Sequence, residues 1–223
     1  MFSLPTYKRP DKLKNFIESY KRTGATAPVE VIIQGDPSLY DEIEYPEHWQ
    51  VIKLDDNIGF VAALNSTFYR HPNEPFYGII CDDHEAISEG WDTQLQTLAG
   101  ALNIVSINDD SPVWQNRLAG PCAFGGDLIR TAGFIMPPCN WHICGDDWWE
   151  MVGRTLGNWI ISPDIRSKHY CPDWTGEAKD DTHNSSYRDF HGEVDKYNAW
   201  LQTDGNAILE KIQGVLRSVP SNA

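Results

Sequence analysis

Short apolar runs alternate with amphipathic stretches through the first hundred residues of the chain. Apolar and β-branched runs predict four strands, at Phe2–Leu4, Val29–Ile33, Gln50–Leu54 and Phe76–Cys81. Apolar residues at helical spacing predict three helices, at Asp11–Arg22, Asn57–Tyr69 and Trp91–Leu102. This alternation predicts an α/β fold with a mostly parallel sheet flanked by helices, in which ligands bind at the carboxyl ends of the strands.

The pattern is less regular beyond residue 105. The glycine-rich stretch Gly120–Gly126 is expected to form a loop that leads into a short helix. Two helices are expected, at Asp127–Ala132 and from about Asp146 to Leu156, and two strands, at Asn158–Ile161 and Ile165–Tyr170. The tail from Val194 to about Leu216 is expected to be helical, with a break near Asp204-Gly205. We expect a single domain over residues 1–185, with residues 186–223 as a helical extension packed on it.

Charge is unevenly distributed along the 223 residues. The chain has 18 lysines and arginines against 32 aspartates and glutamates, which gives a net charge of −14. Six of the basic side chains but only two of the acidic ones lie in residues 1–24, so a basic first segment precedes a strongly acidic body. Because nonspecific nucleic-acid binding depends on counterion release by basic side chains, this composition argues against it, and equally against an anionic membrane surface.

Neither membrane spans nor disulfides are expected. No apolar stretch approaches the roughly 20 residues of a membrane helix, and the first residues lack the basic and apolar regions of a secretory signal. The five cysteines include no C-x-x-C pair, so we expect reduced thiols. These features predict a cytoplasmic protein, in the host cytoplasm if the source is viral, with no membrane partner.

The strongest chemical signal is a cluster of acidic residues and a histidine at the end of the fourth predicted strand. The apolar run Gly78–Cys81 is followed directly by Asp82, Asp83 and His84, at a point where the chain is expected to turn. Adjacent carboxylates repel each other, so their placement predicts a cation between them. Oxygen ligands with one imidazole suit Mg²⁺ or Mn²⁺ better than zinc. An acidic turn that caps the following helix is the alternative interpretation.

Five segments, in order along the chain, carry a further resemblance. They are Leu4–Pro10, Asn57–Asn65, Asp82–His84 followed by Gly90-Trp91-Asp92, Gly145–Trp149, and a late histidine. Together they resemble small nucleotide-sugar glycosyltransferases of phage type with the GT-A fold, over about residues 2–185. The resemblance implies that residues 1–185 form one GT-A-like (Rossmann-like) catalytic domain.

The resemblance also implies roles for individual residues. The metal ligands would be Asp83 and His84 with a late histidine, His169 or alternatively His183. Which of Asp82, Asp83 and His84 contacts the metal is left open by the alignment. Donor contacts would come from Thr6, Lys8, Arg9, Asp36, Asn57, Asn65 and Asp82. Asp36 lies later than the acidic residue that commonly follows the second strand of this family.

The implied reaction is the transfer of a sugar from a nucleotide-diphosphate donor, UDP by resemblance, to a hydroxyl acceptor with Mn²⁺ or Mg²⁺. Inverting members keep an acidic catalytic pair, which implies Asp147, or in second place Asp146, as the general base. The phage resemblance suggests a hydroxymethylated pyrimidine in DNA as acceptor, whereas the acidity of the chain favours a glycan or small molecule. A metal-dependent nucleotidyl or phosphoryl transferase and a nonenzymatic, cation-stabilised binding module are the alternatives.

Aromatic residues and soft metal ligands add two further indications. Six of the nine tryptophans lie between residues 110 and 175, where their faces could stack on sugar rings or nucleobases. Since adjacent helix positions cannot both face one core, one of Trp148 and Trp149 is expected to line an acceptor pocket. A zinc site is an alternative use of Cys139, His142, Cys144, His169 and Cys171, although their spacing matches no finger or ribbon.

Overall fold

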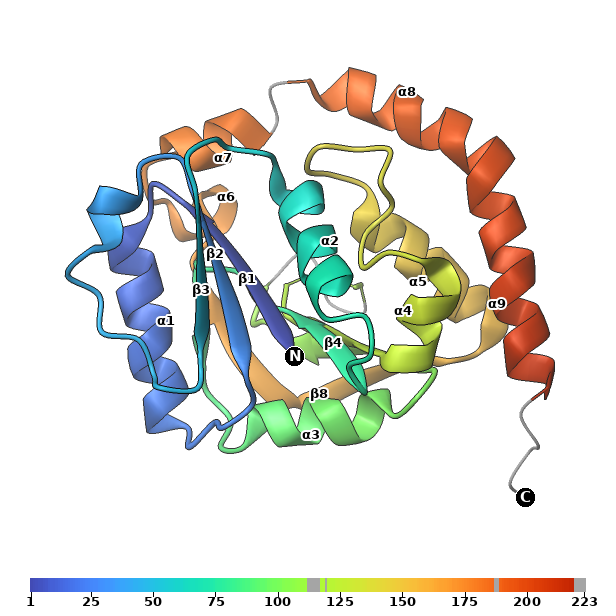
Figure 1. Ribbon diagram of the computed structural model, residues 1–223, viewed down its shortest axis with the longest axis horizontal. Coiled ribbons are helices and arrows are strands. Elements are labelled where there is room, and N and C mark those ends of the chain that lie inside the picture. Colours follow the sequence, from blue (N-terminus) through green and yellow to red (C-terminus); the bar gives the residue numbers. More distant parts are fainter. Residues whose placement is uncertain (112–116, 119, 187–188, 219–223) are drawn as a thin grey trace.

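Eight strands of the described residues form one mixed sheet with helices on both faces (Figure 1). The computed structural model describes residues 1–111, 117–118, 120–186 and 189–218. The strands are β1 (Phe2–Tyr7), β2 (Val29–Gln34), β3 (Gln50–Leu54), β4 (Phe76–Ile79), β5 (His84–Ala86), β6 (Ile104–Asn108), β7 (Cys122–Gly125) and β8 (Trp159–His169). The helices of the first 160 residues are α1 (Pro10–Arg22), η1 (Pro37–Tyr40), α2 (Phe60–Arg70), α3 (Trp91–Ala99), α4 (Gly126–Ala132) and α5 (Gly145–Leu156). Those that follow are α6 (Pro172–Thr175), α7 (Asp181–Ser186), α8 (Phe190–Trp200), η2 (Leu201–Gly205) and α9 (Asn206–Ser218).

The sheet is parallel on one side and mixed on the other. Its strand order is β3-β2-β1-β4-β7-β6-β8-β5. The first four strands in this order run parallel, β7 is antiparallel to both β4 and β6, β8 is parallel to β6, and β5 is antiparallel to β8. The α/β architecture predicted from the alternating pattern is therefore confirmed.

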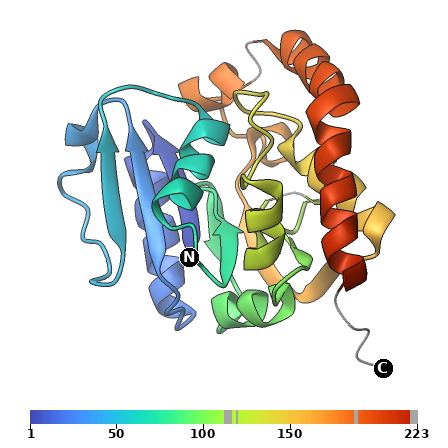
Figure 2. The ribbon, with the colours of Figure 1, turned by 45° about the vertical axis from the view of Figure 1, so that its right-hand side comes forward.

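Two apolar clusters fill the layers on either side of the sheet. Residues of α1 and α3 pack on one face, and residues of α2, α4 and α5 pack on the other. The arm formed by α8, η2 and α9 lies outside α4 and α5, as the two ribbon views show (Figures 1 and 2), and α9 contacts α4. Among the described helices, none is both long and apolar enough to cross a bilayer.

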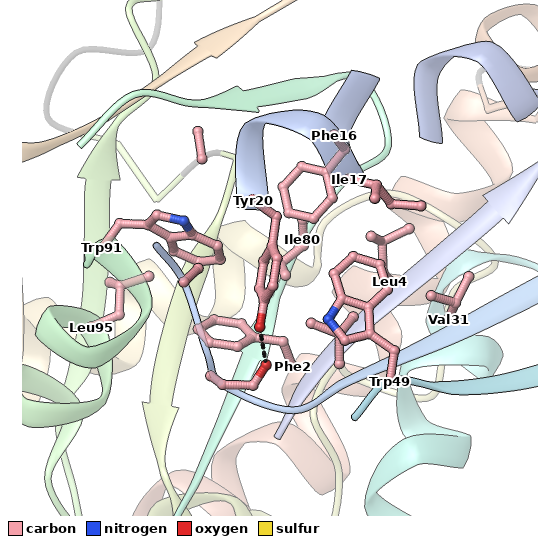
Figure 3. Packing of buried hydrophobic residues seen from close by; sticks show 14 of the residues in the cluster. Phe2, Leu4, Phe16, Ile17, Tyr20, Val31, Trp49, Ile80, Trp91 and Leu95 are labelled. Carbon is pink, nitrogen blue, oxygen red and sulfur yellow. Dashed lines mark hydrogen bonds between the residues drawn. The ribbon is translucent and has the colours of Figure 1, made fainter. Parts of the chain in front are cut away.

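Aromatic rings organise the cluster beneath α1 and α3 (Figure 3). The rings of Phe2 and Trp91 lie 5.1 Å apart between centroids, and the Tyr20 hydroxyl donates a 2.8 Å hydrogen bond to the carbonyl oxygen of Ala27. The buried Asp92 carboxylate accepts hydrogen bonds of 2.7 Å from the backbone N–H groups of Thr26 and Ala27. The Gly90-Trp91-Asp92 segment thus stabilises the turn before β2 and does not enter the cavity described below.

The structure corrects the prediction for the glycine-rich stretch. Residues 122–125 form the buried strand β7, paired with β4 on one side and β6 on the other, where a loop was expected. Four residues, the last of them a glycine, are too short a pattern to show a periodicity, so the pairing partners on both sides decide that this segment is a strand.

The expected pair of strands after α5 is one strand. β8 runs from residue 159 to 169, and its pairing with β6 shifts register between Ile107 and Asn108, whose partners are Ser162 and Arg166. The irregularity accommodates Pro163, which cannot donate a hydrogen bond to a sheet ladder.

The C-terminal arm is continuous where a break was expected. Residues 201–205 form one π-helical turn that joins α8 to α9, so Asp204-Gly205 widens the helix locally without ending it. Trp200 and Ile212 of this arm are buried in the cluster of α4 and α5. The domain boundary at residue 185 stays a prediction.

The arm also holds the loop before α5. Glu193 of α8 is 5 % exposed, and its Oε2 accepts hydrogen bonds from the backbone N–H groups of His142 and Ile143 at 3.0 and 2.9 Å. Two backbone donors would lose their partner if this carboxylate were removed.

We therefore expect Glu193→Ala to lower the free energy of unfolding by about 1–3 kcal/mol, because it leaves those N–H groups without an acceptor. Urea denaturation measures the change. Glu210→Ala, at an exposed position of α9 on the same arm, is the matched control and should change stability by less than about 0.5 kcal/mol. Equal effects of the two substitutions would contradict the structural role of Glu193.

Candidate active site

A cavity of about 630 Å³ opens at the carboxyl ends of β1, β2 and β4. One wall comes from the first 83 residues, and the other comes from the segments around α5, the end of β8, and α6 to α8. Its size lies in the range of ligand-binding pockets. The polar and charged residues of the lining are Thr6, Tyr7, Arg9, Gln34, Asn57, Asp82, Asp83, His142, Asp146, Asp147, His169, Asp173, Thr182, His183 and Ser185.

Two adjacent carboxylates meet one arginine at the floor of this cavity. The Nη1 atom of Arg9 lies 3.2 Å from Asp82 Oδ1 and 3.2 Å from Asp83 Oδ2. The Thr6 hydroxyl donates a 2.7 Å hydrogen bond to the other oxygen of Asp82. On its far side, Arg9 donates to both oxygens of Asp180, at 2.7 and 2.8 Å.

Burial and neighbouring charges separate the two carboxyl groups electrostatically. Burial raises the pKa of Asp82 to about 6, although Arg9 opposes the shift. Burial also acts to raise the pKa of Asp83, but the imidazoles of His169 and His84 outweigh it and hold that pKa well below its usual range. Despite burial, the surrounding aspartates keep the pKa of Arg9 raised, so its guanidinium stays charged. Asp83 is thus the permanently anionic member of the pair.

His169 is brought to Asp83 by the pairing of β5 with β8. In this antiparallel pair, His84 lies directly opposite His169, and the two rings stack with centroids 3.9 Å apart. The Nε2 atom of His169 lies 3.7 Å from Asp83 Oδ1, and its Nδ1 lies 3.2 Å from Asp109 Oδ2. Burial acts to lower the pKa of His169, but the hydrogen bonds to Asp109 and Asp83 prevail and raise it to about 9.

These residues fit a divalent cation. Asp109 takes the Nδ1–H of His169 and leaves Nε2 directed toward Asp83, which is the arrangement that carboxylates impose on metal-binding histidines. The ligand atoms of His84, Asp109 and His169 lie within 4.8 Å of one another, as do those of Cys81, Asp83 and His84. Of the residues in these two groups, Cys81, Asp83 and His169 line the cavity, so the site would reach a ligand through them.

Asp109 was missed by the sequence reasoning. It lies two residues after the mostly apolar run Ile104–Ile107, whereas Asp82 comes directly after its own apolar run, and it is 6 % exposed. The signal was therefore present, but the region beyond residue 105 had no clear pattern to identify β6 as a strand.

His84 lies behind the site and does not line the cavity. Its side chain is 1 % exposed, and its Nδ1 lies 3.2 Å from Asp83 Oδ1. Burial and the neighbouring His169 lower the pKa of His84. A Cβ atom at Gly120 would lie 2.8 Å from its Nε2, so a glycine at that position leaves room for the ring.

A second carboxylate pair lies at the start of α5. Asp146 and Asp147 both line the cavity, in the first turn of the helix. Burial, with the neighbouring Asp147 carboxylate, raises the pKa of Asp146 to about 6. Asp147 is 46 % exposed, and its Oδ1 accepts a 2.6 Å hydrogen bond from Arg117. The two carboxylates therefore differ in environment, one buried and the other ion-paired.

Of the residues expected to bind the donor, the structure brings four to the cavity. Thr6, Arg9, Asn57 and Asp82 line it. Gln34, at the end of β2, also lines it and accepts a hydrogen bond from the backbone N–H of Ile58 at 2.9 Å, although the sequence reasoning did not select it.

The other three expected donor contacts lie elsewhere. Asp36 is exposed and caps η1, accepting from the backbone N–H of Ser38 at 3.0 Å. Lys8 is about half exposed, and its ammonium lies 3.5 Å from Asp181. The Asn65 amide is buried and holds the backbone of Ile135 and Met136 by three hydrogen bonds of 2.8–2.9 Å. Each of these positions has a local structural explanation.

The tryptophan prediction is wrong. Trp148 and Trp149 are both fully buried, and neither lines the cavity. α5 lies between the sheet and the C-terminal arm, so Trp149 packs on Phe124 of β7 while Trp148 packs on Trp200 of α8. Adjacent helix positions can both be buried because the helix has packing partners on two sides.

Among the tryptophans whose side chains the structure describes, Trp141 is the one that lines the cavity, with 47 % of its surface exposed. Its ring lies against Gly59, where a Cβ atom would come within 2.6 Å of it and where φ is +88°. Both the close approach and the backbone conformation require glycine, which explains the Asn57-Ile58-Gly59 segment. Trp114 lies outside the described residues.

The zinc set considered from sequence does not assemble. Among the described residues, Cys139, His142 and Cys144 belong to no group of three metal-binding side chains within ligand distance. Burial lowers the pKa of His142 to about 4, so this imidazole is neutral.

The comparisons with known proteins rest on structure alone, since no protein-family model and no curated protein sequence matches the chain. S. aureus TarS aligns with a TM-score of 0.57 at 11 % identity, over 77 % of this chain and 36 % of TarS, so the chain spans about a third of that protein. The catalytic domain of Drosophila β1,4-galactosyltransferase 7, in complex with xylobiose, aligns with a TM-score of 0.50 at 12 % identity, over 84 % and 78 % of the two chains. A mutant of the Drosophila enzyme in complex with manganese, UDP-Gal and xylobiose gives 0.48 at 12 % identity, over 84 % and 79 %. The fold is therefore GT-A-like.

The buried amide of Asn65 leads to a stability prediction. We expect Asn65→Ala to lower the free energy of unfolding by at least about 2 kcal/mol, because three buried backbone groups lose their partners. Asn57→Ala removes one local hydrogen bond, to Gly59, and should cost about 1 kcal/mol or less. Denaturant titration of both variants checks this. A stable Asn65→Ala protein that binds UDP more weakly would instead assign Asn65 to the donor site.

Proposed function

We propose that this protein is a metal-dependent glycosyltransferase that moves a sugar from a nucleotide-diphosphate donor to a hydroxyl acceptor. The observation that carries the proposal is the meeting of Asp83 and His169, with Asp109 behind the histidine, at the floor of a 630 Å³ cavity in a GT-A-like fold. UDP is proposed as the carrier from the sequence resemblance.

The charge of the cavity explains why a metal is needed. Five aspartates line it, namely Asp82, Asp83, Asp146, Asp147 and Asp173. Among the described lining residues, Arg9 is the one arginine or lysine, and its guanidinium is occupied by three of the chain's aspartates. A diphosphate would be repelled by this lining.

Asp83 and His169 would hold Mn²⁺ or Mg²⁺, with Asp109 fixing the orientation of the imidazole. When bound, the ion supplies positive charge that stabilises the diphosphate as it departs. Thr6, Arg9, Asn57 and Asp82 line the same cavity and would bind and orient the donor. No contact with the donor is proposed for Asp36, Lys8, Asn65 or His84.

Asp146 is proposed as the general base, in place of the Asp147 favoured by the sequence. A base works best with a pKa near the operating pH, and burial gives Asp146 a pKa of about 6, whereas Arg117 binds the Asp147 carboxylate. The acceptor oxygen forms a bond to the anomeric carbon as the bond from that carbon to the diphosphate oxygen breaks, and Asp146 takes the hydroxyl proton. This displacement inverts the anomeric configuration.

The acceptor is proposed to be an uncharged glycan or small molecule. The acidic lining disfavours a polyanion, and the half-exposed Trp141 offers an aromatic face of the kind on which sugar rings stack. The Drosophila enzyme of the same fold was crystallised with xylobiose. A hydroxymethylated pyrimidine in DNA stays the alternative, and parallel assays on modified DNA and on free glycans distinguish the two.

The metal site leads to the first functional prediction. We expect Asp83→Asn to reduce release of nucleoside diphosphate from the donor by at least about 100-fold with Mn²⁺ or Mg²⁺ present, because the neutral amide is a poor cation ligand. Asp36→Asn, which changes the exposed aspartate after β2, is the control and should keep full activity. Product release from a panel of nucleotide sugars is followed by chromatography.

Three outcomes would count against the proposal. Wild-type protein that releases no nucleoside diphosphate from any sugar donor would refute it. Release of pyrophosphate would favour a nucleotidyl transferase. Absence of nucleotide-sugar binding, combined with a large change in melting temperature for Asp83→Asn, would favour a cation-stabilised binding module.

The carboxylate pair of α5 gives a pH prediction. If Asp146 is the base, the transfer rate should rise with pH through about 6 and then level off, because the carboxylate accepts a proton only when ionised. Asp147→Asn removes a neighbouring negative charge, which lowers the pKa of Asp146 and moves the rise to lower pH.

Asp146→Asn should reduce transfer by roughly 10²–10⁴-fold while leaving UDP binding unchanged, since the side chain acts on the acceptor. Steady-state transfer rates between pH 5 and 8 and calorimetric UDP titrations provide the measurements. Full activity of Asp146→Asn together with an inactive Asp147→Asn would assign the base to Asp147.

A further inference from the structure

A second group of metal-binding side chains lies on the C-terminal wall of the cavity. Cys171 follows β8 and caps α6, Asp173 lies in α6, and His183 lies in α7. The thiol sulfur, a carboxylate oxygen and an imidazole nitrogen of these residues lie within 4.8 Å of one another. All three residues line the cavity, and none belongs to the two groups that contain His84, one with Cys81 and Asp83 and the other with Asp109 and His169.

The spacing of these atoms suits a single small ion. The Nε2 atom of His183 lies 3.6 Å from Asp173 Oδ1. Bonds of about 2.0–2.3 Å in a tetrahedral arrangement place ligand atoms roughly 3.3–3.7 Å apart, which matches this distance. Only small movements of the side chains would be needed to bring all three ligand atoms onto one ion.

The chemistry of the three atoms indicates a different metal from that of the Asp83 site. Thiolate, imidazole and carboxylate are all ligands that Zn²⁺ takes, whereas Mg²⁺ and Mn²⁺ prefer oxygen. Asp173 already attracts a cation, because the ammonium of Lys179 lies 2.6 Å from the same Oδ1 atom that faces His183. Zn²⁺ would displace this ammonium, which is half exposed and can move into solvent.

The local structure gives a reason for such an ion. α6 has four residues and α7 has six, and helices this short are not stable without tertiary support. Between them, Asp180 binds Arg9 and accepts a 2.7 Å hydrogen bond from the His183 N–H. Thr182 also donates a 2.7 Å hydrogen bond to the carbonyl oxygen of Tyr7. An ion that joins Cys171 and Asp173 to His183 would fix the segment that presents Asp180 to Arg9.

We infer that Cys171, Asp173 and His183 form a zinc site, separate from the site at Asp83. Zn²⁺ joins α6 to α7 there and keeps one coordination position for water or for an oxygen atom of a cavity ligand, as three-ligand zinc sites do. The inference does not depend on the proposed transferase activity, since its ligands and its metal are different.

Cobalt substitution tests the site directly, because Co²⁺ replaces Zn²⁺ and its bond to a thiolate gives a near-ultraviolet charge-transfer absorption. Metal-free wild-type protein titrated with Co²⁺ should show this absorption with a stoichiometry of one, and Zn²⁺ should abolish it. Cys171→Ser should lose it, and His183→Gln should weaken Co²⁺ binding at least about 10-fold. Cys139→Ser, a thiol outside the cavity lining, and Asp83→Asn should both keep the signal.

The result can overturn the inference in two ways. No thiolate absorption in the wild type means that there is no cysteine-ligated site. Absorption that Asp83→Asn removes, and that Cys171→Ser and His183→Gln leave unchanged, means that the thiolate belongs to the Asp83 site, where Cys81 lies within ligand distance. Circular dichroism of each variant shows that it is folded, and Zn²⁺ should raise the melting temperature of the wild type but not that of His183→Gln.

Discussion

Two adjacent carboxylates, the buried Asp82 and the mostly buried Asp83, lie together, and their mutual repulsion must be offset by groups from distant parts of the chain. Arg9 supplies a guanidinium from the segment after β1, and His169 supplies an imidazole from the end of β8. Without such partners, burial of a charged carboxylate costs several kcal/mol. The requirement therefore ties the N-terminal strands to the C-terminal part of the sheet, and it places the opposing groups at one end of the cavity.

The same electrostatic environment gives the carboxylates of the site different protonation behaviour. The imidazoles of His169 and His84 keep Asp83 ionised. Burial raises the pKa of Asp82, which also accepts a hydrogen bond from the Thr6 hydroxyl. At the opposite wall, burial raises the pKa of Asp146, whereas Arg117 binds Asp147. Each pair of neighbouring aspartates thus contains two groups of different chemistry, and this difference comes from burial and partners because the residue type is the same.

Some elements of the fold can be predicted from the sequence, and others cannot. The parallel strands and the helices between them follow from local periodicity, because an amphipathic helix or an apolar strand carries its pattern within ten or so residues. β7 does not, since the four residues Cys122–Gly125 become a strand only when β4 and β6 offer pairing partners. The burial of Trp148 likewise cannot be predicted from nearby residues, because the C-terminal arm that covers it comes some fifty residues later.

The sequence by itself determined the order of the α/β elements, the acidic character of the body and the position of Asp82 and Asp83 at the end of a strand, since all three are properties of neighbouring residues. Only the tertiary structure decided that Asp109 supports His169, that His84 is buried beside Asp83 without lining the cavity, and that Asn65 holds the backbone of residues 135 and 136. These outcomes depend on strand pairing and packing between residues far apart in the chain. Chemically equivalent candidates, such as Asp36 and Asp83 or His84 and His169, differ only in where those contacts place them.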